Sequence, residues 1–105
     1  MLPQARRLSR RDVERLMKEG RPLTAGALRM RYVASTLSSS RFAFVVSKKV
    51  ARDAVGRNRL RRWAAAAALE LPAHPPIDAA VTLTRRFASL AEVREELSAL
   101  IARCR

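Results

Sequence analysis

The spacing of apolar residues near the start of the chain predicts a short helix over residues 10–19. Apolar positions within this stretch recur at helical intervals, with charged residues between them. Ser9 and Asp12 stand where a capping box would close the first turn, and Gly20 supplies a stop signal.

The pattern then changes to the period of two that is typical of a β-strand. Between residues 28 and 33, apolar and basic residues alternate, which predicts one buried face and one basic face. The buried set is Leu28, Met30 and Tyr32, and the basic set is Arg29 and Arg31. After a polar turn at 35–40, the apolar run 42–46 predicts a strand near the middle of a sheet, able to form a hairpin with its predecessor. Phe42 and Phe44 share one face of it, which favours an interior position for both.

Residues 53–71 carry the longest helical pattern, although Gly56 inside it costs about 1 kcal/mol relative to alanine. On a helical wheel one stripe is apolar and the opposite arc is polar. The stripe is Leu60, Trp63, Ala67 and Leu71, and the arc is Arg57, Asn58, Arg59, Arg61 and Arg62. We therefore expect one side of this helix, Trp63 included, to hold the core while the other faces a partner.

Prolines at 72, 75 and 76 end this helix, and residues 79–84 predict a further strand. Ser89 and Glu92 then cap a final helix with one apolar face. That face is Leu90, Val93, Leu97, Leu100 and Ile101. The predicted order is α-β-β-α-β-α, with the first extended region open to division into two strands. This is an α+β fold in a single domain over residues 1–105.

The formal net charge of +13 points to a class of partner. Residues 1–31 hold nine basic side chains against three acidic ones, residues 41–62 hold eight against one, and residues 64–105 hold five against five. The whole excess lies in the first 62 positions, as expected of a protein that neutralises phosphates. Nineteen of the basic residues are arginine, whose planar fork can hold a phosphate and stack on a base.

Other function classes find little support. No apolar run is long enough to span a membrane and the basic N-terminus lacks the apolar segment of a secretory signal, so we expect a cytoplasmic protein. Cys104 is the lone cysteine, and His74, the lone histidine, lies between prolines. Three glycines form no phosphate loop. We accordingly expect no catalytic residue and no metal site in the chain.

The segment from Phe42 to Trp63 carries the most specific motif. Its apolar strand ends in Ser47, Lys48 and Lys49, and the helical run Arg57-Asn58-Arg59-Leu60-Arg61-Arg62 follows. Together with the earlier Arg6-Arg7-Leu8 segment, this pattern resembles the protein subunit of bacterial ribonuclease P over most of the chain. The resemblance implies a two-layer α/β sandwich whose mixed sheet contains a left-handed β-α-β crossover, against the usual right-handed rule.

The resemblance also implies a function. The protein would join the catalytic ribonuclease P RNA, and together they would remove the 5′ leader of precursor tRNA, using Mg²⁺ bound mainly by the RNA. No membrane and no obligate protein partner is implied. The implied RNA-binding residues are Arg6, Arg7, Ser47, Lys48, Lys49, Arg57, Asn58, Arg59, Arg61 and Arg62.

A cleft between the first helix and the sheet would grip the single-stranded leader in this family. Aromatic residues commonly line that cleft, whereas this sequence has Val13 and Met17 in the helix and Arg29 and Arg31 on the strand. We expect phosphate contacts and arginine stacking to take the place of base stacking on aromatic rings.

Two other classes of protein share some of these features. A non-enzymatic ribosomal or RNA-chaperone protein would have the same charge and fold class. A helix-turn-helix DNA-binding regulator fits less well, because strands flank the basic helix and no dimer face is evident. The RNA recovered with the protein separates a ribonuclease P subunit from a ribosomal or RNA-chaperone protein. It would be one large non-ribosomal species for the former and ribosomal RNA for the latter. For Arg85 and Arg86 we expect an ordinary solvated surface.

Overall fold

The protein was analysed as a computed structural model, which describes residues 6–71 and 76–104. The helices are α1 (Arg10–Glu19), α2 (Ala54–Glu70) and α3 (Leu90–Ala102). The strands are β1 (Arg21–Ala25), β2 (Leu28–Ala34), β3 (Arg41–Val46) and β4 (Ile77–Leu83). The order α-β-β-β-α-β-α confirms the α+β class and divides the first extended region into two strands.

One mixed sheet has the strand order β1-β2-β4-β3. β2 pairs antiparallel with β1 and with β4, while β3 pairs parallel with β4. The expectation that residues 42–46 lie mid-sheet and form a hairpin with the preceding strand is therefore wrong. β4 takes the inner position because six of its seven residues are buried, so it tolerates neighbours on both edges and layers on both faces.

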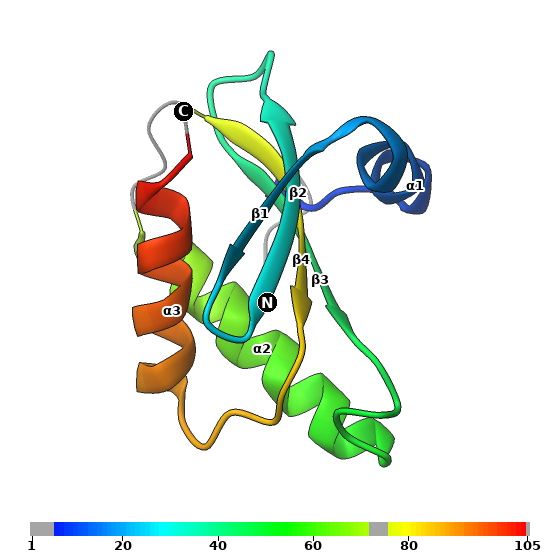
Figure 1. Ribbon diagram of the computed structural model, residues 1–105, viewed down its shortest axis with the longest axis vertical. Helices are drawn as coiled ribbons and strands as arrows, with labels where there is room; N and C mark the ends of the chain where they lie inside the picture. Colours follow the sequence, from blue (N-terminus) through cyan, green and yellow to red (C-terminus); the bar gives the residue numbers. More distant parts are fainter. Residues whose placement is uncertain (1–5, 72–75, 105) are drawn as a thin grey trace.

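The connection from β3 through α2 to β4 is a left-handed crossover. In Figure 1, β3 and β4 both run downward, α2 lies behind them, and β4 lies to the left of β3. A parallel connection of this kind is right-handed in nearly all proteins. The left-handed crossover that the family resemblance implied is therefore present in this chain.

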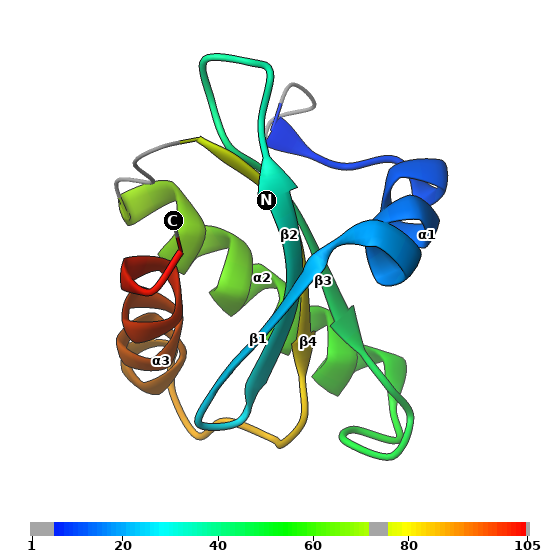
Figure 2. The same cartoon turned by 45° about the horizontal axis from the view of Figure 1, so that its top comes forward.

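Helices cover the two faces of the sheet unequally. Figures 1 and 2 show α2 and α3 packed on one face and α1 alone on the other. The inward residues of β2 are buried as predicted, and α3 buries Val93, Leu97, Leu100 and Ile101. The core therefore lies between the sheet and the α2–α3 pair.

The buried stripe of α2 differs from the predicted one. It runs through Leu60, Ala64, Ala67 and Ala68, whereas Trp63 is only half-buried at its border. Alanine side chains let α2 approach β3 and α3 closely, and this close packing leaves no room for an indole in the centre. The assignment of Trp63 to the core is thus corrected to a boundary position.

Local capping explains where the helices begin. At α1 the Ser9 hydroxyl accepts from the Asp12 amide at 3.1 Å, and the Asp12 carboxylate accepts from the Ser9 amide at 3.1 Å. This reciprocal pair is the predicted capping box. At α3 the Ser89 hydroxyl caps the Glu92 amide, but the Glu92 carboxylate accepts from Ala88 instead of from the cap residue.

A buried ion pair ties β3 to β4 on the face that carries α1. The Arg41 guanidinium donates to both carboxylate oxygens of Asp78, at 3.0 and 2.7 Å, and Asp78 is 5% exposed. Hydrogen bonding to Asp78 raises the pKa of Arg41 above its ordinary value. Arg41 also lies 3.8 Å from Asp12, so one side chain links both strands to α1. Among the described residues, no helix is long and apolar enough to cross a bilayer.

Candidate nucleic-acid interface

The first turn of α2 depends on a glycine and an aspartate. Asp53 is the N-cap, and its carboxylate accepts from the Gly56 amide at 3.1 Å. A Cβ at position 56 would lie 2.8 Å from Asp53 Oδ1 and 3.2 Å from Arg86 Nη2, so any other residue would have to displace the capping carboxylate. The cap recovers about 1 kcal/mol, which offsets the cost of glycine inside the helix.

The polar arc of α2 lies on the surface as predicted, with differences between its members. Asn58, Arg59 and Arg62 are exposed, while Arg57 and Arg61 are half-buried. Arg57 donates to the carbonyl oxygens of Ala51 and Arg52, at 3.0 and 2.8 Å. It therefore holds the turn that precedes the helix, with part of its guanidinium already engaged.

The charge of this arc is not neutralised within the described part of the chain. Every ion pair found there joins other residues, and the contact of Arg61 is with the neutral Asn58 Oδ1 at 3.2 Å. Unpaired like charges on one arc repel each other until an anion relieves them. The arc is therefore suited to a polyanion.

Ser47, Lys48 and Lys49 lie in the turn between β3 and α2, and all three are exposed. The Ser47 carbonyl accepts from the amides of Val50 and Ala51, at 3.1 and 3.2 Å, which turns the chain toward the start of α2. The structure thus brings this predicted set to the N-terminal end of the arc (Figure 1).

The N-terminal segment joins the same surface through a contact that periodicity did not predict. Arg7 forms an isolated parallel bridge with Phe42, and the Leu8 amide donates to the Phe42 carbonyl at 3.1 Å. Arg6 donates through Nε to the Ser40 carbonyl at 3.2 Å. This contact consists of one residue pair at the edge of β3, which is too short to produce a strand pattern in the sequence.

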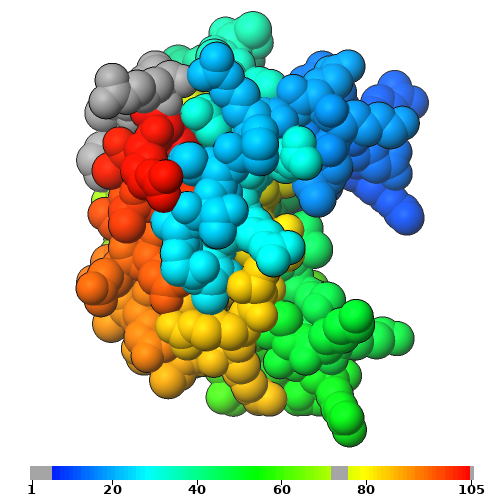
Figure 3. Space-filling view, viewed as in Figure 1, coloured from blue at the N-terminus to red at the C-terminus, as the bar shows by residue number. Residues whose placement is uncertain are grey.

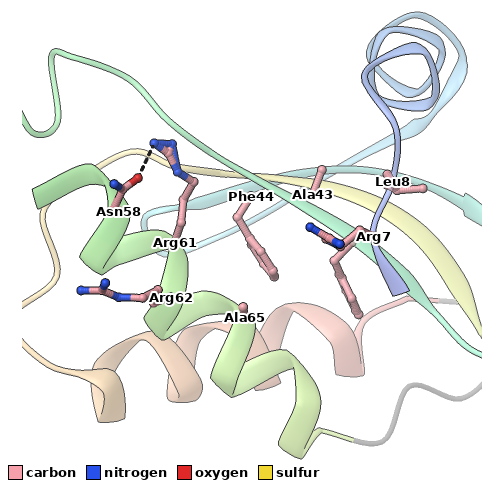
Figure 4. Close-up of a pocket in the computed structure, with 9 residues that line it drawn as sticks. Arg7, Leu8, Ala43, Phe44, Asn58, Arg61, Arg62 and Ala65 are labelled. Carbon is pink, nitrogen blue, oxygen red and sulfur yellow. Dashed lines mark hydrogen bonds between the residues drawn. The ribbon is translucent and has the colours of Figure 1, made fainter. Parts of the chain in front are cut away.

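A pocket of about 360 Å³ opens where this segment, β3 and α2 meet (Figure 4). It is lined by Arg7, Leu8, Phe42, Ala43, Phe44, Asn58, Arg61, Arg62 and Ala65. Four of the predicted RNA-binding residues line this pocket, namely Arg7, Asn58, Arg61 and Arg62, so the N-terminal and helical sets form one surface.

The predicted leader cleft lies on the opposite face of the sheet. A hollow of about 330 Å³ there is lined by Met17, Pro22, Leu23, Thr24, Arg29, Met30, Arg31, Ala80 and Thr82. Three of the four predicted cleft residues are thus together, whereas Val13 is half-buried and outside the lining. Arg31 Nη1 donates to the Gly20 carbonyl at 3.2 Å, so the exposed Arg29 is the freer cation. In Figure 3 the surface is indented beside the blue α1, where cyan and yellow parts of the sheet lie.

Arg85 and Arg86, expected to be equivalent, differ in the structure. Arg85 pairs with Glu92 at 3.3 Å and Glu96 at 2.8 Å, which raises its pKa above the ordinary value. Arg86 instead lines a hollow of about 320 Å³ with Arg59 and Trp63, beside the first turn of α2. Arg86 is exposed, as expected for both residues, and it lies beside Arg59 of the arc, whereas Arg85 is paired within the molecule.

The histidine, cysteine and carboxylate side chains of the described residues do not gather at one place. No group of three histidine, cysteine or carboxylate side chains among them could hold a metal ion, so they do not fit a magnesium site of the chain's own. Cys104 is buried, and desolvation raises the pKa of its thiol, which disfavours the reactive thiolate. His74 lies outside the described residues.

Comparisons with known proteins converge on one family. The family model described as ribonuclease P matches residues 2–105. A protein named ribonuclease P protein component from Synechococcus elongatus is 43% identical over 75 residues, which cover 67% of this chain and 62% of that protein. The same values hold for its counterpart in a second Synechococcus strain. The match thus spans about 62% of the length of these curated relatives.

Solved structures show the same fold. The RNase P protein from Thermotoga maritima superimposes with a TM-score of 0.82 at 26% identity, covering 94% of this chain and 97% of that one. The Staphylococcus aureus RNase P protein gives a TM-score of 0.80 at 18% identity, with 94% of each chain covered.

Proposed function

The chain belongs to the ribonuclease P protein family, and on this premise we propose that it is the protein subunit of that ribonucleoprotein endonuclease. It would bind the catalytic RNA and the 5′ leader of precursor tRNA, and so assist removal of the leader. The observation that carries the proposal is the outward arc of α2, whose guanidinium groups have no carboxylate partner among the described residues.

In this proposal the protein supplies binding and electrostatics, and the RNA performs the chemistry. Two RNAs repel each other through their phosphates, and a cationic surface between them lowers that repulsion. The Mg²⁺ ions would be held mainly by RNA phosphates, because a surface of net positive charge repels a free divalent cation. The protein would therefore lower the magnesium concentration that the RNA needs.

The leader would run through the hollow between α1 and the sheet. Arg29 is exposed there and free to contact a phosphate, and the apolar side chain of Met17 offers a contact for a base. Because the lining contains no aromatic side chain, contact with the leader would be mostly with its backbone. Leader recognition would then depend weakly on sequence.

Reconstitution with a bacterial ribonuclease P RNA tests the proposal. The double change Arg59→Glu and Arg62→Glu should abolish assembly with the RNA and cleavage of precursor tRNA at low magnesium, since it reverses the centre of the arc. Far-ultraviolet circular dichroism should remain that of the wild type, because both side chains are exposed.

The matched control reverses Arg94 on α3 and Arg103 directly after it, which changes the net charge equally but away from the arc; its circular dichroism is compared too, because Arg94 pairs with Glu70. This control should assemble and cleave as the wild type does. Normal cleavage at low magnesium by the α2 double variant would refute the proposal.

A further inference from the structure

The pocket between α2, β3 and the N-terminal segment is lined by an aromatic ring that the core covers only in part. Phe42 is 1% exposed, whereas its neighbour Phe44 is only half-buried. Their rings are stacked, with centroids 5.8 Å apart and planes 10° apart. One face of Phe44 therefore packs on the core through Phe42, and the remaining surface of its ring borders the pocket.

The rim of the pocket is cationic and polar. Figure 4 shows Phe44 between Arg7 on one side and Arg61 on the other, with Arg62 and Asn58 on the adjoining turns of α2. No acidic side chain lines the pocket. Asn58 Oδ1 accepts from Arg61, which leaves the amide Nδ2 as a donor for a polar edge.

This combination selects one ligand chemistry. A simple anion would make no favourable contact with the aromatic ring, and an apolar ligand would leave the three arginine side chains without a partner. A nucleotide has both parts, because its base stacks on an aromatic ring while its phosphates pair with guanidinium groups. The volume of about 360 Å³ lies within the range of small-molecule sites and accommodates one base.

We propose that this pocket binds an unstacked nucleobase of the partner RNA, with the base against Phe44 and its flanking phosphates on Arg7 and Arg62. The hydrogen bond from Leu8 to Phe42 holds the N-terminal wall in place, so the pocket is formed before RNA arrives. This inference rests on the proposed function and adds to it a site for a single base, next to an arc that otherwise contacts only the backbone.

Chemical footprinting of a bacterial ribonuclease P RNA bound to the protein tests the inference. Dimethyl sulfate and a carbodiimide together modify the Watson–Crick edges of all four bases, and hydroxyl radicals report the backbone. With the wild type, at least one unpaired base should be protected. Phe44→Leu should remove that base protection and weaken binding about tenfold, while the backbone footprint and the salt dependence of binding stay the same. Phe44→Tyr, which keeps the ring, should restore the base protection.

A second variant covers the case in which Phe44→Leu fails to fold. Ala65→Leu fills the pocket from α2 without removing a charge or an aromatic ring, and it should produce the same loss of base protection. Unchanged base protection in a folded Phe44→Leu or Ala65→Leu protein would overturn the inference and leave the proposed function standing. Failure of the wild type to bind the RNA at all would instead overturn the proposed function.

Discussion

Arg85 and Arg86 are neighbours in the chain, yet their guanidinium groups lie in opposite surroundings. Arg85 contacts two carboxylates of α3 and lies 4.2 Å above the ring of Phe87. Arg86 has no carboxylate partner among the described residues and rests against the first turn of α2, beside Arg59. A charge already satisfied within the molecule gains little from a phosphate, whereas an unpaired one gains a counter-ion.

This difference gives a matched pair of variants. Arg86→Ala should weaken binding to ribonuclease P RNA and reduce the slope of log affinity against log salt by about one, as loss of one phosphate contact predicts. Arg85→Ala should leave that slope unchanged and lower the melting temperature, because it removes the link between the β4–α3 loop and α3. Filter binding at several salt concentrations and thermal unfolding measure the two effects. Equal slopes for both variants would place Arg86 outside the interface.

Individual elements were predictable where their signals are local. The bounds of α1 follow from Ser9, Asp12 and Gly20, and the buried alternation of β2 follows from its period of two. The position of β3 in the sheet could not be predicted, because its partner β4 is more than thirty residues away in the sequence. A uniform apolar run is also the same pattern in a central strand and in an edge strand covered by a helix. The handedness of the crossover came from the family resemblance alone.

The cap of α1 makes a prediction about stability and pH. Hydrogen bonds from Ser9 lower the pKa of Asp12 below its ordinary value of 3.8. A carboxyl group whose pKa is lowered on folding stabilises the fold fully above that ordinary value and loses its contribution as the pH falls through the lowered pKa. Ser9→Ala should therefore lower the free energy of unfolding by about 1 kcal/mol at pH 7. The loss should become smaller as the pH falls through the pKa of Asp12, because the protonated carboxyl group no longer accepts from the Ser9 amide as a carboxylate. Urea unfolding of both proteins at pH 7 and near pH 2 measures this. A cost that does not vary with pH would exclude a role for the Asp12 charge.

At the scale of the whole molecule, the charge asymmetry along the sequence becomes an asymmetry in space. The basic first 62 residues form α1, three strands and the polar arc of α2, while the balanced remainder forms β4 and α3. In Figure 3 the blue and green segments project on one side of the molecule and the orange α3 covers the other. Glu92 and Glu96 of α3 pair with Arg85, and Glu70 at the end of α2 pairs with Arg94 at 2.9 Å. These carboxylates therefore do not compete with RNA for the arginines of the α2 arc, which have no ion pair among the described residues.

This arrangement predicts the salt dependence of binding by the wild-type protein. If the α2 arc, the Lys48–Lys49 turn and Arg7 together neutralise about six phosphates, the logarithm of affinity for ribonuclease P RNA should fall against the logarithm of salt with a slope of about −5. The dependence arises because each neutralised phosphate releases condensed counterions, whose return is favoured at high salt. Binding measured between 50 and 300 mM monovalent salt, at constant magnesium, gives the slope, and Arg94→Ala on α3 should not change it. A slope near −1 would mean that the outward charges of α2 do not meet the RNA backbone, and the cationic side would then require another polyanionic partner.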